Sequence, residues 1–258
     1  MRSDGALGAR IHLNPKGRVM SQTVISKDGL TATIDSMGAE LTSLALDGRE
    51  YLWQADPAFW GKHAPVLFPI VGSLRDKQAS CSQGMCHMER HGLARINEHR
   101  VAEIAEDGAS VTFEFTDTPD TLEAYPYHFK LNMTYAITGP ATLTQTFTVT
   151  NTGDVELPFS VGGHPAFNIP VPGDEGDEPE RFEDYEIRFA EPWSCHAPKI
   201  VEGGLASYAD PFDVVDDVQV LPLTRDLFAY DTLTLDHVPV QGSMAANGAS
   251  PAADQMAM

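Results

Sequence analysis

Four pairs of alternating hydrophobic segments, each divided by a two-residue turn signal, constrain the fold of this chain more than any other feature of its sequence. Asp28-Gly29, Asp47-Gly48 and Asp107-Gly108 divide the first three pairs, and Gly139-Pro140 divides the fourth. Alternation with a period of two is typical of a strand with one buried face, and Asp-Gly relieves the cost of positive φ in a tight hairpin. The sequence therefore predicts consecutive antiparallel hairpins.

The pair on either side of Gly139-Pro140 shows the pattern most clearly. Residues 129–137 carry large hydrophobic side chains at alternate positions, and residues 142–150 carry threonine at alternate positions. Gln145 shares the hydrophobic face of the second segment, so it either meets a buried partner or lines a cleft. A turn of helix is expected only at residues 120–125. The fold class is all-β, and a sandwich of large antiparallel sheets is the expected architecture.

The net charge of the chain limits the classes of partner that it is expected to bind. Lys and Arg total 17 and Asp and Glu total 37, which gives a formal net charge of −20 over 258 residues. A phosphate-binding surface needs clustered cationic side chains, so we expect neither nucleic acid nor an anionic membrane as a partner, whereas a neutral small molecule is compatible with this charge. No apolar run reaches the ~18 residues of a membrane span, and residues 1–20 lack the apolar core of a signal peptide.

The cysteines and the two ends of the chain complete this outline. Three cysteines cannot all pair within one chain, so we expect reduced thiols and a cytoplasmic protein. Residues 1–19 and 239–258 lack the alternation; we expect a disordered or non-native extension at the start, with Met20 as the true first residue, and a low-complexity tail at the end. One β-sandwich domain is expected between them, over residues 20–238.

Two of the nine histidines have unusual neighbours in the sequence. His164 lies in GGHPAFN, after a segment, residues 155–161, that alternates like a strand, so we expect it at a strand end. The flanking glycines allow a ligand to approach closely, and Pro165 holds the chain extended. His91 lies in RHGLAR, beside another glycine and between arginines. Each taken alone also fits an ordinary loop histidine, but neutral imidazole near pH 7 donates or accepts a proton, which makes both candidates for acid–base chemistry.

A metal site is the less favoured alternative for this region. CSQGMCHMERH places Cys81, Cys86, His87 and His91 within one short stretch. Structural zinc prefers two separate knuckles with tight spacings, and here the ligands crowd together without a second knuckle, so we expect no metal. The sequence also contains no GxSxG, no glycine-rich phosphate loop ending in Lys-Ser or Lys-Thr, and no HExxH, which removes serine hydrolase, P-loop and zincin chemistry.

Five motifs together resemble a known family. They are LW at 52–53, FW at 59–60, PVLFPIVGSLRD at 65–76, RHGLAR at 90–95 and FSVGGHPAFN at 159–168. Their order and spacing resemble the aldose 1-epimerase (galactose mutarotase) family, and most of all its bacterial aldose 1-epimerase-like branch. The resemblance runs from about Val24 to about His237. It implies a galactose mutarotase-like β-supersandwich of antiparallel sheets with a sugar-binding cleft across one sheet.

The resemblance also implies an activity. Family members interconvert the α and β anomers of free aldohexoses, one branch acts on hexose 6-phosphates, and neither a metal nor an organic cofactor is needed. By the family match His164 is the general acid at the ring oxygen, and His91 binds the sugar and helps to place that oxygen.

Four further residues are candidate sugar ligands under the resemblance. Arg75 and Arg95 are candidates for a hydroxyl or phosphate group, although relatives often place arginine directly after the LFPIVG glycine, where this chain has Ser73. Asp226 lies where the family has an acidic or polar residue before its late strands. Phe167 is a candidate for stacking on a sugar face, as are Trp53 and Trp60, although core packing is the commoner fate of an aromatic residue.

The sequence departs from the family near its end. The family's general base is a glutamate in a motif resembling C-I-E-P-W on one of the last strands, and here residues 239–258 stand in its place. We therefore expect an incomplete sandwich, an activity impaired by loss of the base, and a frameshifted or truncated gene product. Glu191, in another EPW triplet, follows His164 too closely to be that base. A carbohydrate-binding protein without catalysis is the alternative function.

Overall fold

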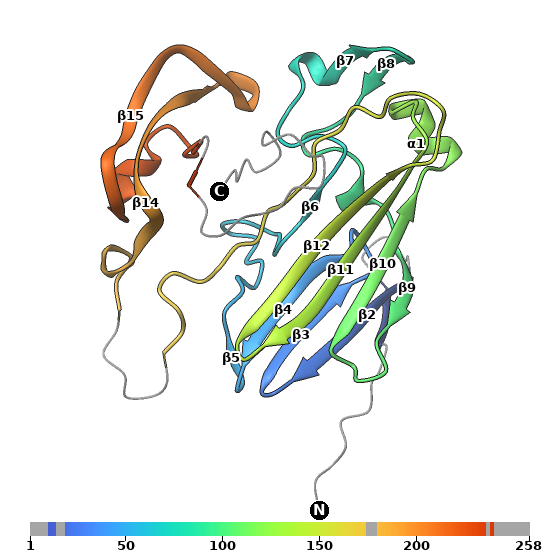
Figure 1. Ribbon diagram of the computed structural model, residues 1–258, viewed down its shortest axis with the longest axis horizontal. Helices are drawn as coiled ribbons and strands as arrows, with labels where there is room; N and C mark the ends of the chain where they lie inside the picture. The colour runs from blue at the N-terminus through green and yellow to red at the C-terminus, as the bar shows by residue number, and fades with distance from the viewer. Residues whose placement is uncertain (1–9, 14–18, 174–179, 236–237, 240–258) are drawn as a thin grey trace, which may run out of the picture. The chain divides into compact units, whose positions relative to one another are not determined.

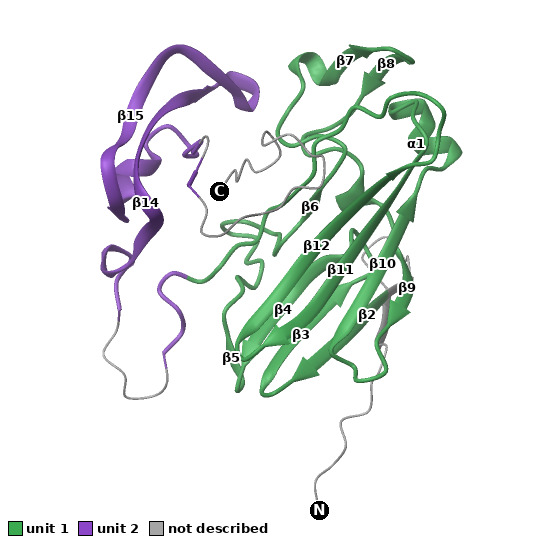
Figure 2. Cartoon of the chain, in the orientation of Figure 1, with its two compact units in different colours: residues 1–168 green, residues 169–258 purple. Residues whose placement is uncertain are grey.

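The computed structural model of the protein describes residues 10–13, 19–173, 180–235 and 238–239, and it divides into two compact units, residues 1–168 and 169–258 (Figure 2). The predicted extension at residues 1–9 and 14–18 and the predicted tail at residues 240–258 lie outside the described residues. Strands dominate both units, and the sheets of unit 1 are antiparallel, as predicted (Figure 1).

The first sheet of unit 1 has five antiparallel strands in sequence order. They are β1 (Arg10–Leu13), β2 (Val19–Lys27), β3 (Leu30–Asp35), β4 (Glu40–Leu46) and β5 (Arg49–Glu50). The predicted turn residues join them: Asp28 and Gly29 have φ values of 52° and 87°, and Asp47 and Gly48 have 50° and 87°. Aspartate and glycine accept this left-handed backbone at low cost, which is why these dipeptides mark the hairpins.

The second sheet of unit 1 has four antiparallel strands, in the order β12-β11-β10-β9. Their bounds are β9 (Arg100–Ile104), β10 (Ser110–Thr116), β11 (Phe129–Gly139) and β12 (Thr142–Asn151). The threonine row of β12 is exposed, as its alternation predicted, while the opposite row is half-buried. At the β11–β12 turn the left-handed residue is Ala141, with φ 51°, rather than one of the two residues of the predicted Gly139-Pro140 signal.

One hydrophobic core lies between these two sheets. Ile34 of β3, Phe113 of β10 and Leu131 of β11 are fully buried and belong to the same cluster. Each side chain of this size stabilises the fold by about 2 kcal/mol when it leaves water. The alternation that predicted the strands is therefore the pattern that fills the sandwich, and Figure 1 shows the two sheets stacked face to face.

Among its described residues, unit 1 also contains one α-helix and two small two-stranded sheets. Helix α1 (Pro119–Ala124) forms where a turn was predicted, with Thr118 as its N-cap. Strand β6 (Val66–Leu67) pairs with β13 (Gly162–Gly163), and β7 (Gln78–Cys81) pairs with β8 (Gly84–His87). Two 3-10 helices, η1 (Arg75–Lys77) and η2 (Ala94–Ile96), belong to the described part of unit 1, and η3 (Phe182–Asp184) is the first of those in unit 2.

Two segments of unit 1 differ from their predicted structure. Strand β1 forms inside the predicted extension, because pairing with β2 uses backbone groups and needs no hydrophobic alternation. The predicted strand over residues 155–161 is extended but joins no ladder: Ser160 N donates to Pro69 O, and the Pro158 and Val155 carbonyls accept from side chains. Pro158 has no N–H to donate to a ladder.

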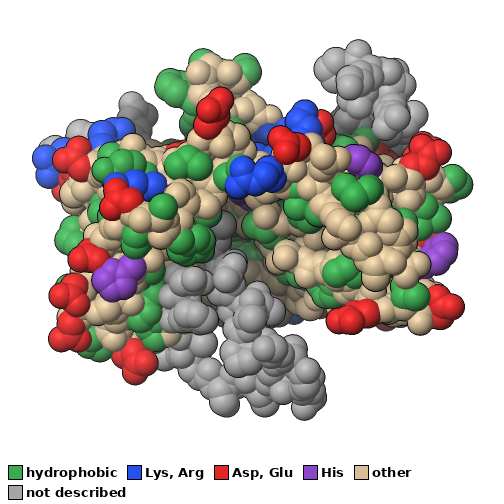
Figure 3. Space-filling view, turned by 90° about the horizontal axis from the view of Figure 1, so that it is seen from above, with side chains coloured by type: hydrophobic (Ala, Val, Ile, Leu, Met, Phe, Trp, Pro, Cys, Tyr) green, Lys and Arg blue, Asp and Glu red, His purple; other side chains and the backbone are tan. Residues whose placement is uncertain are grey.

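Unit 2 is built on one long hairpin. Strand β14 (Glu186–Val201) pairs antiparallel with β15 (Leu205–Pro222) across η4 (Glu202–Gly204), and η5 (Arg225–Phe228) follows. Its own core contains Phe189, Cys195, Val215, Leu221, Leu233 and Leu235. The acidic side chains that give the chain its negative charge are spread over the surface (Figure 3). Within the described part of the chain, no helix has the length and apolar character that a membrane crossing requires.

Candidate functional site

Strand β6 brings the two singled-out histidines together. On one side β6 pairs with β13, and His164 follows β13 directly; on the other side Phe68, which follows β6, forms a bridge with Gly92. The imidazole rings of His91 and His164 meet edge to face, with centroids 5.7 Å apart and planes inclined by 69°. The structure thus places His164 after a strand end, as predicted, although that strand has only two residues.

Gly92 allows the His91 loop to pack against β6. Gly92 has φ 70°, and a Cβ there would lie 2.5 Å from the carbonyl oxygen of Phe68. That oxygen accepts the N–H groups of Leu93 and Ala94 at 2.7 and 3.0 Å, so the loop is fixed against this carbonyl. Any side chain at Gly92 would push the loop, and His91 with it, away from His164.

A pair of hydrogen bonds with Gly72 fixes the tautomer of His91. The backbone N–H of His91 donates to the Gly72 carbonyl at 2.8 Å, and the Gly72 N–H donates to Nδ1 of His91 at 3.0 Å. A ring nitrogen that accepts a hydrogen bond carries no proton, so in neutral His91 the proton is on Nε2. His91 therefore offers an N–H donor to a ligand oxygen.

The surroundings of His91 keep it neutral. Burial of the ring lowers its pKa to about 4, and the cationic groups of His164, Arg95 and Arg90 act in the same direction. At pH 7 the ring therefore carries no charge and serves as a fixed hydrogen-bond donor rather than as a base. This arrangement suits a residue that donates a hydrogen bond to a neutral ligand.

The residues around His164 leave little freedom to its backbone. Its N–H donates to the Pro65 carbonyl at 3.1 Å, and Ala166 N donates to the His63 carbonyl at 2.9 Å. A Cβ on Gly163 would lie 3.0 Å from Oε1 of Gln145. Gly163 therefore makes room for the Gln145 side chain of β12. The sequence had suggested only that the glycines before His164 let a ligand approach.

Gln145 has a buried hydrogen-bond partner, which is one of the two alternatives that the sequence left open for it. Its Nε2 donates to the hydroxyl of Tyr135 at 2.8 Å, and that hydroxyl donates to the Ala39 carbonyl at 2.7 Å. Burial raises the pKa of Tyr135 above its usual range, so the hydroxyl keeps its proton. The chain of donors links the buried face of the sandwich to the glycines before His164.

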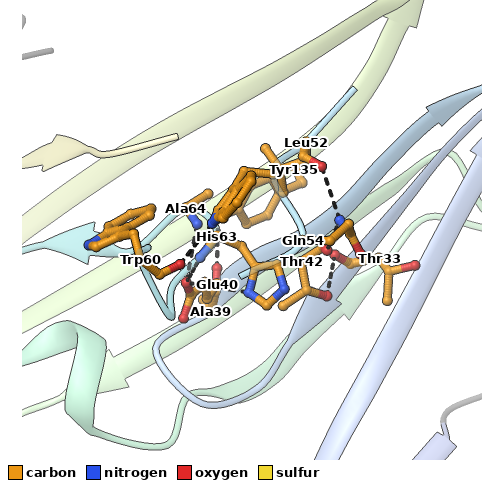
Figure 4. A network of polar contacts seen from close by, with 11 residues as sticks. Thr33, Ala39, Glu40, Thr42, Leu52, Gln54, Trp60, His63, Ala64 and Tyr135 are labelled. Atoms are coloured by element: carbon orange, nitrogen blue, oxygen red, sulfur yellow. Dashed lines mark hydrogen bonds and ion pairs between the residues drawn. The ribbon is translucent and has the colours of Figure 1, made fainter. Parts of the chain in front are cut away.

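Glu40 is a site residue that the sequence did not single out. Its Oε1 accepts the N–H groups of His63 and Ala64 at 2.9 and 3.1 Å (Figure 4), and the same short segment holds His164 and Ala166 by its carbonyls. Glu40 is 9% exposed. A nearly buried carboxylate in a strand is unusual unless it is bonded, but its burial depends on segments far apart in the sequence, so no signal for it was present in the sequence.

The four other predicted ligands have different positions. Phe167 is 53% exposed and bridges to Leu52, just after His164. Arg95 lies on η2, close enough to His91 to lower its pKa, and its buried Nε has no partner among the described residues. Arg75 is exposed on η1, and Asp226 is exposed on η5 in unit 2. Phe167 and Arg95 thus lie near the histidines, and for all four residues the ligand role stays a prediction.

Glu191 lies within unit 2, exposed on β14. Strand β14 continues past Glu191 to Val201. The ladder register shifts between Arg188 and Trp193. This irregularity accommodates Pro192, which cannot donate to a ladder.

The four candidate zinc ligands do not converge. Cys86 and His87 are consecutive on β8, so their side chains point to opposite faces, and Nδ1 of His91 already accepts from Gly72. The thiols of Cys81 and Cys86 lie 2.9 Å apart and are both free. Among the described residues, no group of three or more His, Cys, Asp or Glu side chains is placed to hold a metal ion.

Comparison with known proteins agrees with this fold. The family model for aldose 1-epimerase matches residues 20–238. The plasmid-encoded protein LacX of Lactococcus lactis subsp. lactis is 37% identical over 224 residues, which cover 83% of this chain and 72% of LacX.

Two solved structures share the fold closely. A galactose mutarotase related enzyme from Lactobacillus acidophilus is 30% identical, with a TM-score of 0.74 over 83% of this chain and 68% of its own. A galactose mutarotase-like protein from Lactobacillus casei is 31% identical, with a TM-score of 0.71 over 83% of this chain and 71% of its own. The fold is therefore that of the galactose mutarotase-like proteins, with antiparallel sheets, as predicted. The chain belongs to the aldose 1-epimerase family.

Proposed function

We propose that this protein interconverts the α and β anomers of an aldohexose by acid–base ring opening. The observation that carries the proposal is the edge-to-face contact of His91 and His164, 5.7 Å between ring centroids, with the donor nitrogen of His91 fixed by Gly72. Two imidazoles at this distance can reach two oxygens of one sugar ring. Membership of the aldose 1-epimerase family supports the same reaction class.

The reaction needs a proton moved at each of two oxygens. The anomeric hydroxyl gives its proton to water, the bond between C1 and the ring oxygen breaks, and the ring oxygen gains a proton from the general acid, which gives the open-chain aldehyde. Rotation about the C1–C2 bond and reversal of these steps close the ring on the other face of C1. Each group must lie within ~3 Å of its oxygen and must be able to reverse its role.

The two histidines take different parts in this scheme. His164 donates a proton to the ring oxygen, since histidine changes charge near working pH and the family match assigns it that role. His91 stays neutral, donates from Nε2 to a sugar oxygen, and so holds the ring against His164. The low pKa of His91 supports this division of roles, because a charged His91 would repel a protonated His164.

The second candidate function is a carbohydrate-binding protein that keeps the site without catalysis. His91, held neutral with Nε2 as a hydrogen-bond donor, fits sugar binding as well as catalysis.

A neutral aldohexose is the favoured substrate. The chain carries a formal charge of −20, which disfavours an anionic ligand, and the exposed ring of Phe167 beside His164 offers an apolar face for a sugar. A hexose 6-phosphate is the competing substrate, with Arg95 and Arg75 as candidate phosphate ligands.

Polarimetry tests the proposal. Freshly dissolved α-galactose, α-glucose and glucose 6-phosphate are followed to anomeric equilibrium with the parent protein and with His164→Ala. We expect the parent to hasten equilibration of a neutral sugar and His164→Ala to lose most of that effect. Calorimetric sugar binding without any acceleration would favour the binding protein, and an active parent whose rate survived His164→Ala would refute the role of His164.

A further inference from the structure

Trp60 makes a stacking contact with His164 that the sequence did not predict. The indole ring of Trp60 stacks on the imidazole of His164, with centroids 5.0 Å apart and planes inclined by 30°. An offset stack of this kind is a favourable aromatic geometry. From the sequence, Trp60 was a candidate for stacking on a sugar or for packing in the core. In the structure, one face of its indole ring stacks on His164 instead.

The loop that carries Trp60 is braced at several points. The carbonyl of Trp60 accepts Nε1 of Trp53 at 2.7 Å, and the N–H of Trp60 donates to the Asp56 carbonyl at 2.9 Å. Oδ1 of Asp56 also accepts the N–H of Ala58 at 2.8 Å. The loop is thus a compact turn with its own hydrogen bonds, and the indole projects from a fixed base.

Trp53 also connects the loop of Trp60 to the segment that contains His164. Trp53 N donates to the Ala166 carbonyl at 2.8 Å, and Leu52 bridges to Phe167. Trp53 therefore bonds to the turn of Trp60 through its side chain and to the segment after His164 through its backbone. A displacement of one ring of the stack would have to break contacts that also hold the other.

We propose that Trp60 is a positioning residue that fixes the orientation of the His164 imidazole in the site; this role rests on the proposed function. Turning the His164 ring out of its plane about the Cβ–Cγ bond would break the stack on Trp60 and the edge contact with His91 together. With both contacts in place, the plane of the ring is set before a sugar arrives.

Two Trp60 variants separate this role from sugar binding. Trp60→Leu removes the aromatic face, and Trp60→Phe keeps a smaller one. A matched control is Tyr208→Leu, which removes an aromatic ring that is 63% exposed on β15 in unit 2. We expect Trp60→Leu to lower kcat ~10- to 100-fold with KM changed less than ~2-fold, Trp60→Phe to recover most of kcat, and Tyr208→Leu to match the parent.

Nuclear magnetic resonance detects the stack whether or not the protein is active. Protein labelled with ¹³C-histidine shows the ring protons of His164, identified by the signal that His164→Ala loses. Because the indole lies over the imidazole, its ring current shifts that signal upfield in the parent. Trp60→Leu should return the signal to an ordinary position, Trp60→Phe should leave part of the shift, and the signal of the buried His99 should stay unchanged as a check of folding.

The outcomes are distinct. An unmoved His164 signal in Trp60→Leu overturns the proposal, and so does a kcat within ~2-fold of the parent. A rise in KM at unchanged kcat also overturns it and makes Trp60 a sugar contact. A parent without activity refutes the proposed function and with it any effect on rate. The resonance then shows separately whether Trp60 orients His164.

Discussion

His91 and His164 contact each other edge to face, with ring centroids 5.7 Å apart, although they belong to separate loops on either side of β6. Each imidazole is also held by a second partner: Gly72 N bonds Nδ1 of His91, and the indole of Trp60 covers His164. A neutral fixed donor thus stands beside the ring that we propose as the proton donor. The proposed ring opening depends on this difference between the two histidines.

Replacing Gly92 by alanine should damage the site through the backbone. A Cβ at Gly92 would lie 2.5 Å from the Phe68 carbonyl, and the residue has φ 70°. We expect the free energy of unfolding to fall by about 2 to 4 kcal/mol, since strain at φ and a backbone clash add together. The matched control is Gly48→Ala, which has φ 87° and open space around its Cβ, and which should lose only about 1 kcal/mol. Urea denaturation measures both, and equal losses would contradict the clash.

Much of the sandwich could be predicted from the sequence, because its strands have one buried face each. The alternation in residues 129–137 and the Asp-Gly signals at Asp28 and Asp47 marked hairpins that the structure confirms. Residues 155–161 were predicted as a strand because hydrophobic and polar residues alternate there. They join no ladder, and Phe159 is 44% exposed. Alternation does not report whether a neighbouring strand is present to form a ladder.

The candidate site was predicted only in part. His91 and His164 were singled out by their glycine-rich neighbours, and the structure brings them together. Glu40 and the stacking role of Trp60 were missed, because both depend on contacts between segments far apart in the sequence. No local pattern can show that a carboxylate on β4 accepts the N–H groups of residues 63 and 64.

Glu40 should matter as a hydrogen-bond acceptor. Glu40→Leu leaves the N–H groups of His63 and Ala64 without their partner, and we expect a loss of about 2 to 4 kcal/mol in the free energy of unfolding. Glu40→Gln keeps a carbonyl oxygen and should cost about 1 kcal/mol. Thermal or urea unfolding measures the free energy of unfolding of both variants. Similar losses in the two variants would show that the charge of Glu40, and not its two backbone contacts, stabilises the segment.

His99 should make the protein sensitive to mild acid. It is 1% exposed, stacks on Phe115, and its Nε2 bonds the Ala94 carbonyl. Burial lowers the pKa of His99 to about 4, although the bond to Ala94 acts in the opposite direction. The unfolded chain, with a pKa of about 6.5, therefore binds more protons between these values, and the free energy of unfolding falls as the pH falls.

The expected loss from His99 between pH 7 and pH 5 is about 2 kcal/mol. Urea denaturation at the two pH values measures it in the parent and in His99→Gln, which keeps a donor for the Ala94 carbonyl but does not titrate. The variant should show a smaller loss than the parent by roughly this amount. An identical dependence on pH in both proteins would exclude His99 as its source.

The three thiols should react in a fixed order. Burial raises the pKa of Cys81, but hydrogen bonds with Cys86 and Tyr127 outweigh it and hold the pKa below its ordinary value. Burial raises the pKa of Cys86 to about 12, and Cys195 is buried in unit 2. We expect iodoacetamide near pH 8 to alkylate Cys81 first, because the thiolate is the nucleophile. Peptide mass spectrometry reads the order, and equally fast labelling of Cys86 would contradict it.

The most direct test of the account is a polarimetric comparison of four proteins: the parent, His91→Asn, His164→Asn and the double variant. If the histidines act on one sugar, the parent hastens mutarotation, each single variant loses most of that rate, and the double variant is hardly slower than His164→Asn, because residues that act as a unit are not additive. A parent that leaves equilibration at the buffer rate, or two single losses that multiply in the double variant, would contradict the claim that His91 and His164 form one catalytic site.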